Sequence, residues 1–155
     1  MTAQTKIIGM PRLLRKLKVL PDAARAEIRV VLAQQADEVV AMMKRLAPED
    51  SGALRKSIGW NWGNKTPQGA MSIATVGKGD LTITIFAGSK EAYYAVMVEF
   101  GTAAHVAGGK FAGAEIPAIP PQAFFWPSWR ALRKGVKSKL RKASRDAARR
   151  VAGAS

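Results

Sequence analysis

Apolar and polar residues recur with a helical period over the first third of the chain. In residues 22–46 apolar side chains return every three or four positions, interrupted at Gln35, and the pattern stops before Pro48. A proline disfavours helical geometry at the residue before it, so this stretch predicts an amphipathic helix of about seven turns. A shorter apolar stripe in residues 9–20 predicts another amphipathic helix before it.

The pattern changes to period two after the long helix. Asp50 or Ser51 is placed to cap a single helical turn that ends near Ser57. Three stretches then alternate apolar and polar residues, as strands with one buried face do: 58–62, 71–75 and 81–86. Because the strands are consecutive and their connections are short, they predict an antiparallel meander.

The C-terminal third begins without any period. Residues 103–120 are rich in glycine, alanine and proline and predict a long loop, of the kind that is functional or mobile. Ser128 is then placed to cap a last helix with a narrow apolar stripe. The stripe fades beyond about Ala143, so residues 144–155 are expected to fray, as are residues 1–8.

Size and composition agree with one domain. The 155 residues predict a single α+β domain over residues 1–155, with a long N-terminal helix packed on an antiparallel sheet and a basic C-terminal helix. The absence of cysteine excludes disulfides, thiolate metal ligands and cysteine nucleophiles. No apolar run approaches the ~20 residues of a membrane span, and the first residues lack a signal-peptide core. We therefore expect no membrane partner, and a place in a cytoplasm or in a particle assembled there.

Two aromatic clusters flank the predicted loop. The first ends in the turn Glu99-Phe100-Gly101-Thr102. A carboxylate in an apolar run needs hydrogen-bond donors, so Glu99 either fixes a turn within the chain or pairs with an arginine or backbone amides of a neighbouring subunit. The second cluster consists of Phe124, Phe125, Trp126 and Trp129. These side chains either pack in the core or anchor a subunit contact, since aromatic residues are enriched at interfaces.

Nothing in the sequence predicts catalysis. His105 is the only histidine, and without cysteine it cannot complete an ordinary zinc site from scattered acids. The glycines around Lys78 predict a turn, because no phosphate-loop pattern surrounds them. We therefore assign no catalytic, metal-binding or cofactor-binding residue, and we expect a protein that is not an enzyme.

Three motifs follow one another in an informative order. They are APEDSGALRKSI at residues 47–58, YAVMVEFGT at residues 94–102 and PQAFFWP at residues 121–127. Together, over roughly residues 13–140, they resemble the HK97 gp10-like family of tailed-phage neck and tail-completion proteins. The third motif departs from the family pattern at Ala123, where the family usually has proline. The long loop and the heavy basic tail also depart from it.

The resemblance implies a structural role in a virus particle. It implies a homo-oligomeric ring, a hexamer, at the head–tail junction, which joins the capsid connector to the tail and leaves a channel for DNA. The partners would be further copies of the chain and the adjacent connector and tail proteins, assembled in the cytoplasm of a bacterial host. Neck and tail-terminator positions both stay open, as do phage, prophage and gene transfer particle. The alternative is a free basic protein that binds nucleic acid without sequence preference.

The formal net charge of +14 is high for this length and is unevenly placed. Ten of the 25 basic residues lie in residues 130–150, against one acid, Asp146. The candidate partner-facing residues are Arg130, Arg133, Lys134, Lys137, Lys139, Arg141, Lys142 and Arg145. This charge run can be a solvated face, a contact to DNA phosphates, or a contact to an acidic protein face. From the sequence we favour the acidic protein face, because DNA that slides through a channel should not be gripped tightly.

Overall fold

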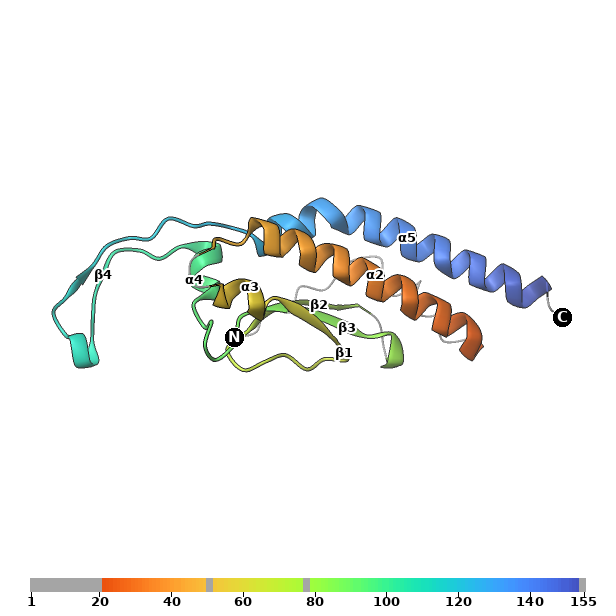
Figure 1. Ribbon diagram of the computed structural model, residues 1–155, viewed down its shortest axis with the longest axis horizontal. Helices are drawn as coiled ribbons and strands as arrows, with labels where there is room; N and C mark the ends of the chain where they lie inside the picture. The colour runs from red at the N-terminus through yellow and green to blue at the C-terminus, as the bar shows by residue number, and fades with distance from the viewer. Residues whose placement is uncertain (1–20, 50–51, 77–78, 154–155) are drawn as a thin grey trace.

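Two long helices and a small sheet make up the body of the molecule. The computed structural model describes residues 21–49, 52–76 and 79–153, and Figure 1 shows their arrangement. Helix α5 (Phe125–Gly153) lies along α2 (Asp22–Leu46), and the sheet lies against the other side of α2. The predicted α+β class, with its long first helix, antiparallel sheet and C-terminal helix, is confirmed. The predicted helix in residues 9–20 lies outside the described residues.

The apolar periodicity of α2 predicts its bounds well. Pro21 precedes the first turn, and Ala47 leaves helical geometry just before Pro48 while its N–H still donates to the Met43 carbonyl at 2.9 Å. The helix is buried on two sides, because the sheet covers one and α5 covers the other. Gln35, the polar break in the pattern, is therefore only 4% exposed.

The three predicted strands exist, but they do not form a meander. They are β1 (Gly59–Trp62), β2 (Met71–Val76) and β3 (Ile83–Ala87), and the order in the sheet is β1-β3-β2 with both pairings antiparallel. The last strand lies in the centre, and its residues are nearly all buried. The connection between β1 and β2 runs back from the Ile83 end of β3 to its Ala87 end, because both outer strands are antiparallel to β3. Near the start of this connection Thr84 donates to the Gly63 carbonyl at 2.7 Å.

Two tryptophans attach β1 to the long helix. Trp60 donates from its indole nitrogen to the Asp37 carboxylate of α2 at 2.8 Å. The guanidinium carbon of Arg29 lies 3.9 Å from the ring centroid of Trp62, a cation–π arrangement. The two indoles are half-buried and pack against the core, so their amphipathic rings join the sheet to α2 at its rim.

The first motif forms the corner between α2 and the sheet. Helix α3 (Ala53–Ser57) is one short turn, and its N-cap Gly52 has a φ of 75°. The Arg55 guanidinium donates to the Ala47 carbonyl at 3.2 and 3.1 Å, and the backbone N–H of Gly88 donates to the Ser57 hydroxyl at 3.0 Å. The proposed caps Asp50 and Ser51 lie outside the described residues.

The stretch predicted as a long loop is an extended hairpin. Strands β4 (His105–Val106) and β5 (Glu115–Ile116) pair antiparallel, and the short 3-10 helix η2 (Gly109–Phe111) follows β4. We call residues 102–121 the arm. It projects away from the body at the end where α4 (Ala95–Phe100) lies, as Figure 1 shows. Its strands are too short for a sequence alternation to reveal them.

Helix α5 differs from the prediction at both ends. It begins at Phe125, before the proposed cap Ser128, and it continues to Gly153, well past Ala143. The continuation has a packing reason, because Ala147 is only 1% exposed. The apolar stripe fades in sequence, but small alanine side chains allow a close approach of the two long helices there.

Candidate assembly and partner-binding surfaces

Glu99 caps the start of α5 from another helix. Its Oε2 accepts hydrogen bonds from the backbone N–H groups of Phe124 at 2.8 Å and Phe125 at 2.9 Å, and its Oε1 accepts one from Trp126 at 2.9 Å. The first four N–H groups of a helix have no partner within the helix, and the next residue, Pro127, has no N–H. One carboxylate thus accounts for every N–H of this helix start.

This arrangement corrects the predicted cap. Ser128 lies inside the first turn of α5, where its hydroxyl donates to the Phe124 carbonyl at 2.5 Å instead of accepting from an N–H. Glu99 takes the capping role from α4, and its negative charge lies at the positive end of the α5 dipole. Glu99 is only 3% exposed, so the carboxylate is satisfied inside the chain.

Gly101 lies at the root of the arm, where the two ends of the arm pair with each other. Thr102 and Ile119 exchange two backbone hydrogen bonds of 2.9 Å, and the N–H of Gln122 donates to the Val98 carbonyl at 2.8 Å. Gly101 has a φ of 69°, and a Cβ there would lie 2.6 Å from the Ile119 carbonyl oxygen. The two strands can therefore approach so closely only at a glycine. The central motif, YAVMVEFGT, is the joint that holds α4, the arm and α5 together.

The aromatic candidates divide into buried and exposed residues. Phe124 and Phe125 are 0% exposed, Trp129 is 7% exposed, and Trp126 is half-buried. Within this chain those four side chains pack in the core. Phe100, by contrast, is 61% exposed at the end of α4.

Large apolar side chains are exposed around α4 and along the arm. We call this set the α4–arm surface, and its members are Tyr93, Val96, Met97, Phe100, Val106, Phe111 and Ile119. Phe111, at the tip of the arm, is 73% exposed. Of these residues, only Phe100 was among the candidate interface residues predicted from the sequence. A lone phenylalanine between glycines, Gly109 and Gly113, was the signal that could have revealed the tip.

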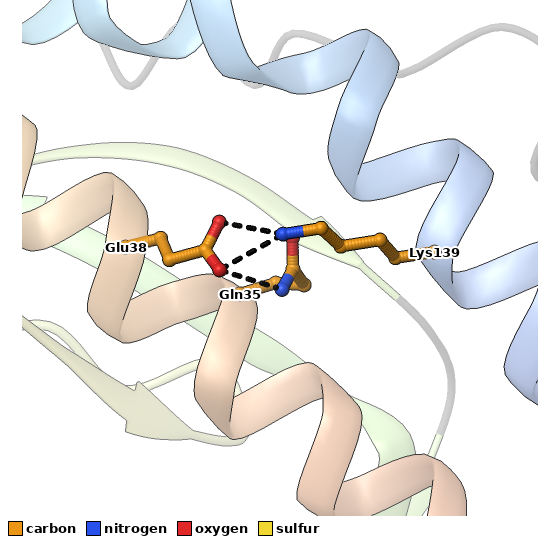
Figure 2. Close-up of polar contacts among 3 residues, drawn as sticks. All are labelled: Gln35, Glu38 and Lys139. Atoms are coloured by element: carbon orange, nitrogen blue, oxygen red, sulfur yellow. Dashed lines mark hydrogen bonds and ion pairs between the residues drawn. The ribbon is translucent and has the colours of Figure 1, made fainter.

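One edge of α5 is neutralised by α2. Figure 2 shows Lys139 donating to both carboxylate oxygens of Glu38, at 2.8 and 2.9 Å, while the Gln35 amide donates to Glu38 at 3.3 Å. The Lys139 ammonium, mainly by this hydrogen bond, lowers the pKa of Glu38 below its ordinary value. Arg150 and Glu27 form a second ion pair at 2.7 Å. The two long helices are therefore antiparallel neighbours with matched charges along this edge.

The other basic candidates on α5 lie away from that edge. The exposed ones are Arg130, Arg133, Lys134, Arg141, Lys142 and Arg145, and Lys137 is half-buried. Arg149 is also exposed and was missed, although it lies one turn beyond Arg145. The spacing of four residues between Arg145 and Arg149 is the sequence feature that could have revealed it.

The described residues contain no group of three or more histidine, cysteine, aspartate or glutamate side chains that could hold a metal ion. His105 is exposed on β4, with its Nδ1 3.0 Å from the Ala103 carbonyl oxygen. Among the helices that the structure describes, none is both long and apolar enough to cross a membrane.

Comparison with protein families decides the relationship. Residues 12–101 of the 155 match the family described as "Bacteriophage HK97-gp10, putative tail-component". The chain belongs to the HK97 gp10-like family. The resemblance read from the motifs is thus confirmed, and this HK97 gp10-like protein has the phage structural role that the family description supports. No curated protein and no solved structure matches it significantly.

The matched region has a clear structural boundary. In the HK97 gp10-like protein it includes α2, the sheet and α4, and it stops at Gly101, where the arm begins. The arm and α5 lie beyond it, as does the third motif in residues 121–127.

Proposed function

We propose that this HK97 gp10-like protein is a virion structural protein that forms a ring at the head–tail junction. The ring joins the capsid connector to the tail and leaves a channel for DNA, and its role is structural and not catalytic. The family match to a phage tail component carries the proposal. A ring of six copies, in contact with connector and tail proteins in the virion, is the assembly that the motifs imply.

The α4–arm surface supports self-association. A hairpin of two short strands is marginally stable alone and has no core of its own, yet the arm exposes Val106, Phe111 and Ile119 to solvent. Exposed apolar groups of this size are typical of interaction sites. An arm that reaches the next copy makes a head-to-tail contact, and such contacts close into rings when the rotation allows.

Self-association is tested by measuring the mass of the full chain over a range of concentrations. We expect wild-type protein to form a closed oligomer, and the double variant Phe100→Ser, Phe111→Ser to stay monomeric with an unchanged circular dichroism spectrum. The matched control is Val30→Ser, Leu46→Ser, because these α2 side chains are also exposed, at 57% and 46%. A wild-type monomer at every concentration, or equal disruption by the control, would contradict the proposal.

The position in the particle is tested in the strain that produces it. Deletion of the gene should give filled heads and separate tails, because the joint between them is missing. The wild-type gene supplied from a plasmid should restore joined particles, and the Phe100→Ser, Phe111→Ser variant should not. Normal, joined particles from the deletion strain would rule out a role at the junction.

A further inference from the structure

The outward face of α5 carries a continuous row of cations. We call it the basic stripe, and its members are Arg130, Lys134, Lys137, Arg141, Arg145 and Arg149. Successive members are three or four residues apart, so they lie on one face of the helix. The row is about 28 Å long at 1.5 Å per residue. The buried residues Val136, Leu140 and Ala147 lie on another face, toward α2.

Five members of the stripe are exposed, namely Arg130, Lys134, Arg141, Arg145 and Arg149. Lys139 and Arg150 pair with Glu38 and Glu27, but they lie on the edge that faces α2. The five exposed members of the stripe form no ion pair with any described residue. Like charges one turn apart on a helix destabilise it, so five exposed cations without a counter-charge on one face are costly unless an anionic partner binds them.

The residues between the cations indicate which kind of anion the stripe binds. The residues that separate them on this face are small, among them Ala131, Ser138 and Ala148. None of the large apolar side chains exposed in the described residues lies on α5. Protein interfaces are anchored by buried aromatic or apolar side chains, whereas a phosphate backbone is held by cations alone. The apolar anchors of this chain are on the α4–arm surface and α2 instead.

We infer that the basic stripe binds the phosphate backbone of duplex DNA without reading its sequence. The long cationic side chains contact phosphates, and the small residues between them let the helix lie close to the duplex. An acidic protein face, which the sequence alone favoured, would have no apolar anchor here. Contacts made only to phosphates also permit sliding, so binding is compatible with DNA that moves.

The inference goes beyond the proposed ring and does not depend on it. The stripe lies on α5, while the proposed self-association uses α4 and the arm. A chain that fails to form rings can still bind DNA through the stripe, and a ring can form without binding DNA. The two proposals can therefore fail separately.

The test measures the salt dependence of DNA binding by the full chain. Anisotropy of a labelled duplex of random sequence is titrated over about 50 to 200 mM salt. Five phosphate contacts predict a slope of log affinity against log salt of about −4 to −5. The variant Arg130→Gln, Lys134→Gln, Arg141→Gln, Arg145→Gln should lower the magnitude of the slope by about 3 to 4 and the affinity at low salt by at least about 100-fold.

The matched control removes the same charge elsewhere. Lys44, Lys56, Lys65 and Lys90 are exposed and lie off the stripe, so changing all four to glutamine should leave the slope as in wild type. An equal loss in the stripe and control variants would show an effect of net charge only, and would overturn the inference. So would a wild-type slope near zero.

Two further measurements keep the result decisive. If circular dichroism shows that the fourfold stripe variant has lost helix, the single variants Lys134→Gln and Arg141→Gln replace it, each with an expected slope change of about 1. Polyglutamate then competes with the labelled duplex. DNA binding predicts displacement only at a large excess of charge, whereas equal potency would assign the stripe to an acidic protein partner and overturn the inference.

Discussion

Glu99 joins two helices that are far apart in the chain. A buried carboxylate normally needs an arginine or lysine nearby, but this one is satisfied by the backbone N–H groups of Phe124, Phe125 and Trp126. Hydrogen bonds to a charged acceptor are stronger than those between neutral groups. Here the negative charge also interacts favourably with the positive end of the α5 dipole. The carboxylate therefore sets the direction in which α5 leaves the arm.

Replacing Glu99 with alanine should destabilise the fold by roughly 2–4 kcal/mol, because two buried N–H groups and the half-buried one of Trp126 lose their acceptor. Urea unfolding followed by circular dichroism measures the loss. Glu91→Ala is the control, since Glu91 is an exposed carboxylate just before α4, the helix that carries Glu99. Equal losses for the two variants would mean that the cap contributes nothing.

Gly101 is required by two independent features, its φ of 69° and the 2.6 Å approach that a Cβ would make to the Ile119 carbonyl oxygen. Gly101→Ala should therefore cost about 1–3 kcal/mol and speed hydrogen exchange at the Thr102 and Ile119 amides. Gly135→Ala makes a contrast, because nothing lies within 4 Å of that position and α5 gains about 0.5–1 kcal/mol. Unchanged exchange at the arm root in Gly101→Ala would refute this account.

At the scale of elements, α2 and the sheet show what periodicity can and cannot predict. The long helix was predicted because a 3.6-residue repeat persists over seven turns, and its bounds agree with the structure. The strand order was not predicted, because alternation identifies a strand and its faces but not its neighbours. The arm was missed for a different reason. Its strands of two residues each are stabilised by pairing across the hairpin, which leaves no local pattern.

The ion pair between Glu38 and Lys139 predicts a pH dependence. The pKa of Glu38 is lowered in the folded protein, so the folded state binds this proton less tightly than the unfolded chain does. The pair therefore stabilises the fold above the ordinary value of 4.5, and the contribution is lost as the pH falls through the folded pKa. The effect should be small, because both side chains are about half exposed.

A double-mutant cycle with Glu38→Gln and Lys139→Ala measures this contribution. The coupling between the two changes in melting temperature should be present near neutral pH and absent well below pH 4.5. A coupling that persists in acid would mean that the two residues interact through packing and not through charge.

At the scale of the whole molecule, the two candidate surfaces lie on different elements. The exposed apolar groups lie mainly around α4 and the arm, at one end of the body in Figure 1, while the exposed cations of the basic stripe lie along α5. Apolar contacts suit association between copies, and a row of cations suits a polyanion. One subunit can therefore contact its neighbours and a second kind of partner at the same time, because the two contacts use different elements.

By itself the sequence determined the long helix α2, the three strands of the sheet, the fold class, the family and the concentration of charge in the last helix. These follow from local periods, from motifs and from composition, which do not depend on how distant segments meet. Only the tertiary structure decided that β3 is central, that Glu99 caps α5 and that α2 neutralises one edge of α5 and not the exposed cations of the stripe. Each of these is a contact between residues far apart in the chain, and a local pattern carries no information about its distant partner.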